Sequence, residues 1–272
     1  MAETPLAIQT HQLTRTFSGK KALDGLTLDV PEGWFFGFLG PNGAGKSTTI
    51  NILTGLLAPS DGSARVLGFD VETQALEIKR RIGVVPDGLH LFERLSGEEH
   101  LRFVGEAHGL PPREARERAG RLLEAMELTN DAHKLVAGYS HGMRKKLALS
   151  CALIHEPRLL FLDEPFEGVD AVATRELRTL LQKLVATRRV TVFLTSHVLE
   201  VVERLCTHVG IITRGRLAAC GSLEELRAGV PGGSGAAGSA RTLEELFLDT
   251  VGAARETAGD GLDWLTRERD PA

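Results

Sequence analysis

The 272-residue sequence lacks any run that approaches the roughly 18 consecutive apolar residues of a membrane span. Its first residues also lack the basic segment followed by an apolar segment that marks a secretion signal. We therefore expect a chain that does not itself cross a membrane and is not secreted by a visible signal.

Cysteine is scarce as well. The three cysteines, Cys151, Cys206 and Cys220, lie far apart and form no Cys-x-x-Cys pair. This spacing argues against a zinc site and against a disulfide framework. This cysteine usage fits a protein of the reducing cytosol. We predict that the three thiols act as small buried apolar side chains.

The sequence also lacks an excess of positive charge. Its 32 Lys and Arg residues are outnumbered by 36 Asp and Glu residues, so the formal net charge is −4. Without a bulk positive field to attract it, nucleic acid is not an expected partner. The 42% hydrophobic and 25% charged residues are typical of a globular protein, and the length fits one large domain or two small ones.

One stretch fits the phosphate-binding loop pattern G-x-x-x-x-G-K-[ST] at every fixed position. It consists of Gly40, Pro41, Asn42, Gly43, Ala44, Gly45, Lys46, Ser47 and Thr48. A strand-like apolar run, 34–39, precedes it, and a helical pattern with Ile50, Leu53 and Leu57 on one face follows. A Gly-rich turn with a chance lysine is the alternative, and this strand–loop–helix context disfavours it.

The residue types of this loop suit a nucleoside triphosphate. Gly40, Gly43 and Gly45 can take backbone conformations closed to other residues, so that N–H groups turn inward toward the phosphates. The helix N-terminus adds its dipole. Lys46 would reach the β- and γ-phosphates, and the Ser47 hydroxyl would ligate Mg²⁺.

The rest of the chain predicts an α/β fold. Residues 6–30 have the pattern of strands and turns, and residues 95–155 read as almost continuous helix between strand-rich flanks, which suggests an inserted subdomain. Strand-like runs then alternate with helical patterns, so we expect a parallel sheet with functional residues at the carboxyl ends of its strands. Such runs lie at 82–85, 159–162, 190–194 and 208–212.

Acidic and aromatic residues near these strands are further candidates. Asp163 ends an apolar strand, where it could hold Mg²⁺ directly or through a water. Glu164 could lie near the γ-phosphate and polarise the attacking water as a general base. Alone, Asp-Glu-Pro after a strand is usually a turn with capping acids, but a phosphate loop favours the catalytic interpretation. Phe17 is either a core aromatic or an aromatic that stacks on a base.

The order of phosphate loop, helical insertion, strand-Asp-Glu and strand-Ser-His resembles that of an ABC transporter ATP-binding subunit over residues 6 to about 228. The segment 243–248 also resembles the export branch, which pairs such subunits with a separate permease. The resemblance implies a phosphate-loop ATPase core with a mostly parallel sheet, an N-terminal antiparallel β part and a helical subdomain inserted at about 88–156. The ATP-binding domain would span 1–228, and a Gly-rich linker with a short helical extension would occupy 229–272.

The resemblance also implies cofactors and partners. The subunit would bind ATP and Mg²⁺ and would pair head to tail with a second copy of itself or a paralogous ATPase subunit. Each ATP would lie between the phosphate loop of one subunit and the signature motif of the other. An integral membrane permease would be the further partner, which places the chain on the cytoplasmic face of the cell membrane.

Roles carry over residue by residue. Phe17 takes the place of the base-stacking aromatic, and Asp170 matches the loop that contacts the opposite subunit. Asp163 would support Mg²⁺, and Glu164 would be the catalytic base. His197 matches the switch histidine that hydrogen-bonds the γ-phosphate and holds the attacking water.

Two positions depart from the family pattern. The signature, usually LSGGQ, reads Tyr139-Ser140-His141-Gly142-Met143, so Ser140 and Gly142 remain to face the partner's γ-phosphate while a glycine has become a histidine. The glutamine usually found before the helical insertion is replaced by Asp87, which keeps an oxygen for Mg²⁺ or its water.

Four apolar residues of a predicted surface loop follow Asp87, namely Leu89, Leu91, Phe92 and Leu95. Such a loop is normally polar, so we expect some of these side chains to contact the permease. The alternative is that they seal the joint between subdomains.

Two other functions stay open. A soluble ABC-type ATPase without a permease would act on chromosomes or ribosomes, but its long heptad arms or tandem domains are missing here. A phosphate-loop kinase is disfavoured by Glu164 and by the lack of an obvious lid for an acceptor substrate.

Overall fold

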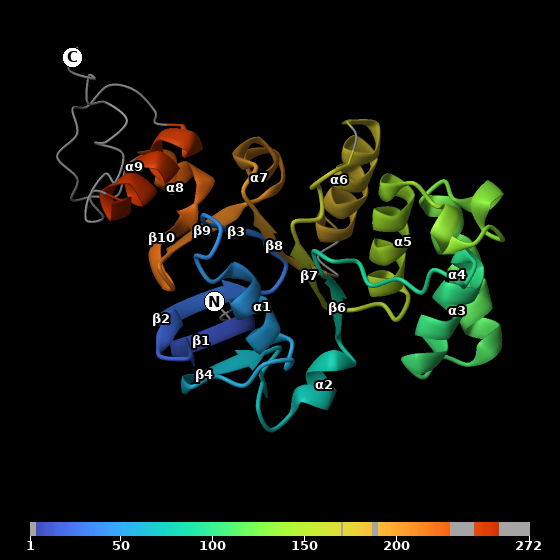
Figure 1. Ribbon diagram of the computed structural model, residues 1–272, viewed down its shortest axis with the longest axis horizontal. Coiled ribbons are helices and arrows are strands. Elements are labelled where there is room, and N and C mark those ends of the chain that lie inside the picture. The colour runs from blue at the N-terminus through green and yellow to red at the C-terminus, as the bar shows by residue number, and fades with distance from the viewer. Residues whose placement is uncertain (1–3, 170, 187–189, 229–241, 256–272) are drawn as a thin grey trace, which may run out of the picture.

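Two β-sheets form the centre of the molecule in the computed structural model, which describes residues 4–169, 171–186, 190–228 and 242–255 (Figure 1). The first sheet has the order β2-β1-β4-β5, and all its pairings are antiparallel. Its strands are β1 (Leu6–Phe17), β2 (Lys20–Pro31), β4 (Asp61–Val66) and β5 (Phe69–Asp70). The predicted N-terminal antiparallel part is therefore confirmed.

The second sheet has six strands in the order β10-β9-β3-β8-β7-β6. Its strands are β3 (Phe35–Leu39), β6 (Ile82–Val85), β7 (Leu159–Asp163), β8 (Thr191–Ser196), β9 (His208–Thr213) and β10 (Arg216–Ser222). Four of its five pairings are parallel, and β10 joins the edge antiparallel to β9. The predicted mostly parallel sheet is confirmed. Both of its faces are covered, which explains the continuous apolar runs of β3 and β7.

Two apolar clusters hold the layers together. Phe36 and Phe38 of β3 pack with α1 (Lys46–Leu53) and the antiparallel sheet, whereas Phe35 and Leu39 point to the opposite face and pack with the helices there. The helices of the core other than α1 are α2 (Ala75–Lys79), α6 (Ala171–Ala186), α7 (Leu199–Leu205), α8 (Leu223–Ala228) and α9 (Leu243–Arg255).

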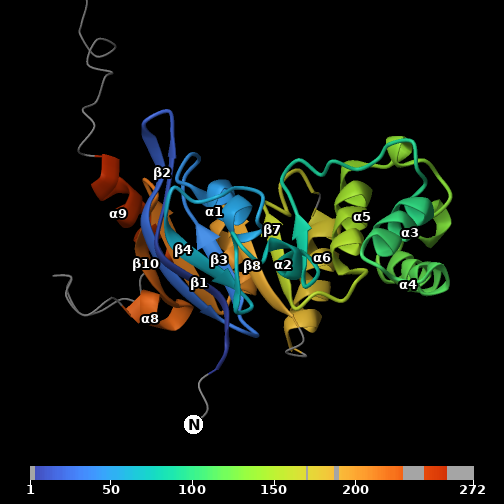
Figure 2. The ribbon, with the colours of Figure 1, turned by 90° about the horizontal axis from the view of Figure 1, so that it is seen from below.

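Three helices lie between β6 and β7 in the chain and form the end of the molecule opposite α8 and α9 (Figures 1 and 2). They are α3 (Gly97–Ala107), α4 (Pro112–Ala125) and α5 (His141–Leu153). Ser96 and Glu99 form a capping box at the start of α3, and Pro112 begins α4. The expectation of almost continuous helix over 95–155 is wrong in detail, because Gly109 (φ 88°) ends one helix and residues 126–140 contain only 3₁₀ turns.

Several local predictions need correction. Helix α1 ends at Leu53, and Leu57 packs against the core from the turn that follows. Strand β10, at the edge of the sheet, was not predicted, because its small and polar residues give no apolar run. Cys206 is buried, but Cys151 is half-buried and Cys220 is exposed on β10, so the prediction of three buried thiols is wrong for Cys220. All three are free. In the described part of the chain, no helix has the length and apolar character of a membrane span.

Candidate functional site

The phosphate loop (residues 40–48) connects the end of β3 to the start of α1. Gly43 (φ 78°) and Gly45 (φ 114°) have the left-handed backbone that favours glycine. Gly40 does not, so the predicted reason for glycine there is wrong. A Cβ at Gly40 would lie 2.4 Å from the backbone oxygen of Ile212, so close packing against β9 requires glycine at this position. Asn42, Gly43 and Ser47 are exposed, and Pro41 and Thr48 are half-buried.

Neighbouring turns support this loop from outside. The N–H of Gly215 in the β9–β10 turn donates to the oxygen of Ala44 at 2.9 Å, and the N–H of Asp24 donates to the oxygen of Gly215 at 2.9 Å. Hydrogen bonds from Lys21 and Arg216 lower the pKa of the Asp24 carboxyl. The β9–β10 turn is thus fixed both to the loop and to β2.

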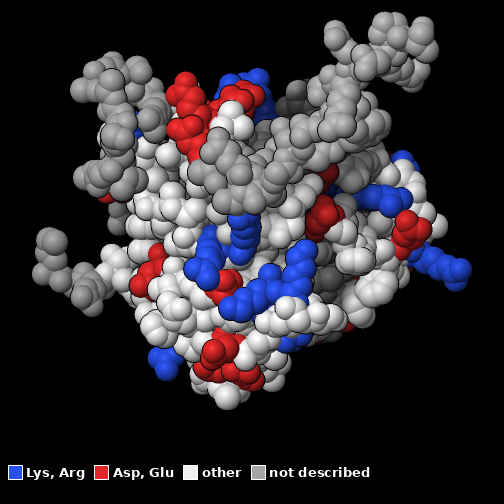
Figure 3. Space-filling model, turned by 60° about the vertical axis from the view of Figure 1, so that its left-hand side comes forward, with Lys and Arg blue, Asp and Glu red and all other residues white. Residues whose placement is uncertain are grey.

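On the face of the molecule that Figure 3 shows, Lys and Arg side chains lie among Asp and Glu side chains.

Phe17 lies at the end of β1, opposite Lys20 of the adjoining strand. Its side chain is 44% exposed, so it is not a core aromatic. The guanidinium of Arg15 lies over the ring, 4.7 Å from its centroid. The ring is therefore available at the surface for a second stacking partner.

Lys46 brings positive charge to the centre of the site. Its side chain is buried, and its Nζ donates to the oxygen of Gly40 at 2.7 Å. The same Nζ lies 3.7 Å from Oε1 of Glu164. A single ammonium group therefore faces both the phosphate loop and the carboxylate at the end of β7.

Asp163 and Thr195 are direct neighbours in the register of β7 and β8. The Thr195 hydroxyl donates to Oδ1 of Asp163 at 2.5 Å, and both residues are buried. This bond fixes the Asp163 side chain at the carboxyl edge of the sheet. The sequence prediction missed Thr195, although its place two residues before His197 on an apolar strand was a usable signal.

Glu164 and His197 contact each other directly. Oε2 of Glu164 lies 3.0 Å from Nδ1 of His197 and accepts the backbone N–H of His197 at 3.3 Å. Glu164 has φ 47°, a left-handed backbone that costs a non-glycine residue roughly 1–2 kcal/mol. Strain of this kind is common at functional sites. The structure thus brings Lys46, Glu164 and His197 together from three separate segments.

The oxygen ligands at this edge fit a magnesium ion. Asp163 supplies a carboxylate and Ser47 supplies an exposed hydroxyl on the first turn of α1. No group of three or more His, Cys, Asp or Glu side chains in the described ranges could form a complete metal site. Mg²⁺ needs no such group, because it usually takes one or two protein oxygens and completes its shell with phosphates and water. Asp87 is exposed on the loop after β6.

The signature residues lie at the start of α5. Ser140 is its N-cap, and its hydroxyl accepts the N–H of Met143 at 3.2 Å. Ser140 is exposed and Gly142 is half-buried. Nε2 of His141 lies 3.2 Å from the oxygen of Glu167, which ties the signature to the segment after Glu164. Within the residues described, no hydrogen bond joins Ser140 or Gly142 to the phosphate loop. Asp170 lies outside the described residues.

The sequence prediction also missed Lys145. This lysine follows the signature on α5, and its Nζ donates to the backbone oxygen of Glu164 at 3.0 Å. Its position one helical turn before the buried Leu149 was a signal that it faces the core.

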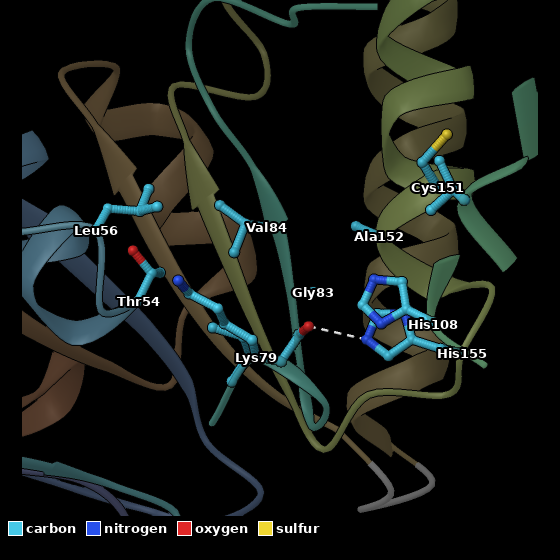
Figure 4. A pocket seen from close by; sticks show the side chains of 11 residues that line it. Thr54, Leu56, Lys79, Gly83, Val84, His108, Cys151, Ala152 and His155 are labelled. Atoms are coloured by element: carbon cyan, nitrogen blue, oxygen red, sulfur yellow. Dashed lines mark hydrogen bonds between the residues drawn. The ribbon is translucent and has the colours of Figure 1, made fainter. Parts of the chain in front are cut away.

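A separate cavity of about 420 Å³ lies between the end of α1, β6 and helices α3 and α5 (Figure 4). The rings of His108 and His155 stack in it with centroids 3.7 Å apart, and Nε2 of His155 lies 2.9 Å from the oxygen of Ile82. Burial lowers the pKa of His155 to about 4, so this imidazole is neutral at pH 7. The cavity contains none of the predicted catalytic residues, and the phosphate loop is the better candidate site.

Comparisons with known proteins identify the family of the chain. The family described as "ABC transporter" matches residues 23–167. The daunorubicin/doxorubicin resistance ATP-binding protein DrrA of Streptomyces peucetius is 39% identical over 221 residues, which are 81% of this chain and 67% of that protein. The bacitracin transport ATP-binding protein BcrA of Bacillus licheniformis is 38% identical over 210 residues, 77% of this chain and 68% of that protein. A solved structure described as "Structure of ATP binding subunit of ABC transporter" matches with a TM-score of 0.79 at 30% identity, covering 90% of this chain and 99% of that one.

Proposed function

This chain belongs to the ABC transporter family as an ATP-binding subunit of the exporter type, and on that premise we propose that its phosphate loop, Asp163, Glu164 and His197 form the site of ATP hydrolysis. The chain binds ATP and is an ATPase of this family. The observation that supports the site is that Glu164 contacts both Lys46 and His197: its Oε1 lies 3.7 Å from Nζ of Lys46, and its Oε2 lies 3.0 Å from Nδ1 of His197.

Each residue has a role that suits its contacts. Lys46 neutralises charge on the terminal phosphates, and the backbone N–H groups at the start of α1 bind their oxygens. Glu164 accepts a proton from the attacking water as general base, and His197 orients that water and the γ-phosphate. Phe17 stacks on the adenine with the ring face that Arg15 leaves free.

Mg²⁺ is the proposed cofactor. Ser47 and Asp163 would hold it, and Asp87 would reach it or one of its waters. When bound, the ion neutralises charge on the β- and γ-phosphates.

The exposed N-terminus of α5 is proposed to complete the ATP site of a second subunit, either another copy of this chain or a paralogue. Ser140 and Gly142 would face the γ-phosphate held by that partner. Under this proposal residues 1–228 form the ATP-binding domain, 88–156 its helical subdomain, and 229–272 a linker with a C-terminal helical extension, of which 229–241 and 256–272 lie outside the described residues. The assembled pair would lie on the cytoplasmic face of the cell membrane.

The permease contact is proposed at an aromatic patch formed by Phe92 and Phe103. These side chains are 54% and 51% exposed and make an edge-to-face contact with centroids 5.5 Å apart. Leu89 and Leu91, by contrast, pack against the apolar core and serve to seal the joint. An exposed aromatic pair beside the helical region is a suitable surface for an amphipathic helix of the permease.

Co-purification with a candidate permease subunit tests the docking proposal. Phe92→Asp should abolish most of the permease binding and leave the fold and basal ATPase rate of the isolated subunit nearly unchanged. Leu248→Asp is the matched control, since Leu248 is 59% exposed on α9, away from the patch. Unaffected co-purification of Phe92→Asp would refute the docking surface. A chain that binds no permease at all would favour a soluble ATPase.

The names of the relatives suggest the kind of cargo. DrrA is named for resistance to daunorubicin and doxorubicin, and BcrA for transport of bacitracin. We propose that this chain likewise powers the export of natural-product antibiotics, with cargo recognised by the permease. Expression of both subunits in a sensitive host should raise the tolerated antibiotic concentration, and the Glu164→Gln subunit should not.

A further inference from the structure

Lys145 is the most deeply buried charged side chain of α5, with 3% of its surface exposed. Apolar residues surround the small void beside it, including Val85, Leu149, Leu162 and Phe166. Burial lowers the pKa of the Lys145 ammonium, although nearby carboxylates oppose the shift. A cation in such a place needs a specific partner.

That partner is the backbone of Glu164. Nζ of Lys145 donates to the Glu164 oxygen at 3.0 Å, while the Glu164 N–H donates to Oγ1 and O of Thr195 at 3.2 and 3.3 Å. Glu164 is thus held on one side by α5 and on the other by β8. Because its φ of 47° is unfavourable for glutamate, these two contacts help to keep the backbone in place.

A direct ion pair does not explain a lysine here. In the described part of the chain Lys145 forms no salt bridge, and burying an ammonium group carries a large desolvation cost. A methionine has similar length and would fill the same apolar surroundings. The adjacent Lys146 differs, because its Nζ forms a salt bridge of 2.6 Å with Glu176 of α6.

We propose that Lys145 is a positioning residue that fixes the backbone of Glu164 to α5, so that the signature serine and the catalytic carboxylate move together. The proposal rests on the dimer proposed above. In that dimer Ser140 meets the ATP held by the partner, whereas Glu164 faces the ATP of its own subunit. Lys145 therefore links the two ATP sites through a single helix.

The test compares three variants of the full chain. Lys145→Met removes the donor and the charge at nearly constant length, and Lys145→Arg keeps both. Lys146→Met is the matched control, because it removes a neighbouring, partly buried lysine that does not contact Glu164. For each variant we would measure kcat, KM for ATP, the Hill coefficient, binding of a fluorescent ATP analogue and Tm.

A positioning role predicts that Lys145→Met lowers kcat by about tenfold to a hundredfold, as expected when a reacting group is misplaced, with KM and nucleotide affinity nearly unchanged. The Hill coefficient should fall toward one. Lys145→Arg should recover most of kcat, and Lys146→Met should stay within about twofold of the parent kcat, as expected for a residue outside the site. If Lys145→Met is not obtained folded, Lys145→Gln replaces it, because its shorter amide does not reach the carbonyl.

The inference is overturned if the Lys145 variant keeps the parent kcat, if KM and nucleotide affinity weaken in proportion to kcat, or if Lys146→Met causes the same loss. Glu164→Gln is measured beside them. If that variant hydrolyses ATP normally, the assignment of Glu164 as base has failed, which is a separate result from failure of the Lys145 link.

Discussion

The N-termini of α1 and α5 differ in how their first backbone N–H groups are satisfied. Helix α1 begins after Gly45, which has no side chain to cap it. Helix α5 begins after Ser140, whose hydroxyl accepts the N–H of Met143. The first turn of α1 is thus open to an outside acceptor such as a phosphate, whereas α5 supplies one of its own. The loop before α1 therefore has the form of a preformed anion site, whereas Ser140 can keep its cap bond and still donate its own O–H to a phosphate.

A buried lysine accompanies each helix, and both lysines reach Glu164. Lys46, at the start of α1, lies 3.7 Å from its carboxylate, and Lys145 of α5 bonds to its backbone oxygen at 3.0 Å. The difference between the two contacts separates their roles. Lys46 faces the Glu164 carboxylate, which we propose to be the general base, and Lys145 holds the backbone of the same residue.

Lys46→Ala should have the largest effect, because it removes the positive charge from the open N-terminus. The ATPase rate of the purified chain should fall by at least about a hundredfold, in the range seen when one charge-stabilising donor is lost. Binding of a fluorescent ATP analogue should weaken as well. A variant that keeps normal turnover would mean that α1 is not the phosphate site.

Glu164→Gln should slow hydrolysis by roughly a hundredfold, as expected for loss of a general base, and should leave ATP binding intact. Unhydrolysed ATP should then hold two subunits together. Size-exclusion chromatography with and without Mg-ATP measures this directly. If nucleotide binds but the elution volume stays that of a monomer, the proposed pairing of α1 with the partner's α5 is wrong.

Ser140→Ala should have an intermediate effect that distinguishes a cap from a ligand. Loss of the cap costs about 1 kcal/mol, and loss of a hydrogen bond to the partner's phosphate should lower kcat by about tenfold. Ser96→Ala is the matched control, because Ser96 caps α3 through a similar bond to Glu99. We expect Ser140→Ala and Ser96→Ala to lower the Tm by the same amount. Only Ser140→Ala should also lower the ATPase rate. Equal ATPase rates in the two variants would make Ser140 a structural cap alone.

Asp87→Ala should have the smallest effect. If its carboxylate assists metal binding beside α1, the Mg²⁺ concentration for half-maximal ATPase should rise a few-fold, which is modest because phosphates supply most of the ligands, and Asp87→Gln should be mild. An unchanged Mg²⁺ titration would leave Asp87 as a turn residue whose negative charge lies near Lys145.

The contiguous parts of the site were predictable from sequence. The phosphate loop occupies consecutive residues between a strand and a helix, so its chemistry and its context are visible in one segment. Asp163 and His197 were predictable because carboxyl ends of parallel strands meet at one edge. The signature was recognisable by resemblance although it reads His141 and Met143 at two family positions.

Other features depended on packing that no segment shows. Thr195 is defined by its register opposite Asp163, and Lys145 by the approach of α5 to the turn after β7. Phe92 is exposed while the nearby Leu89 packs on the core, which the loop sequence does not distinguish. Gly40 is required by the proximity of Ile212, and not by its own backbone angles.

The sequence by itself determined the alternation of strands and helices and the position of the proposed phosphate loop, because periodicity and loop chemistry act over a few neighbouring residues. Only the tertiary structure decided which side chains support Glu164, since Lys46, Lys145, Thr195 and His197 reach it from α1, α5, β8 and the turn after β8. Those contacts exist because two packed layers and the sheet register place distant segments within hydrogen-bond distance. The same packing encloses a lysine that composition alone would assign to the surface.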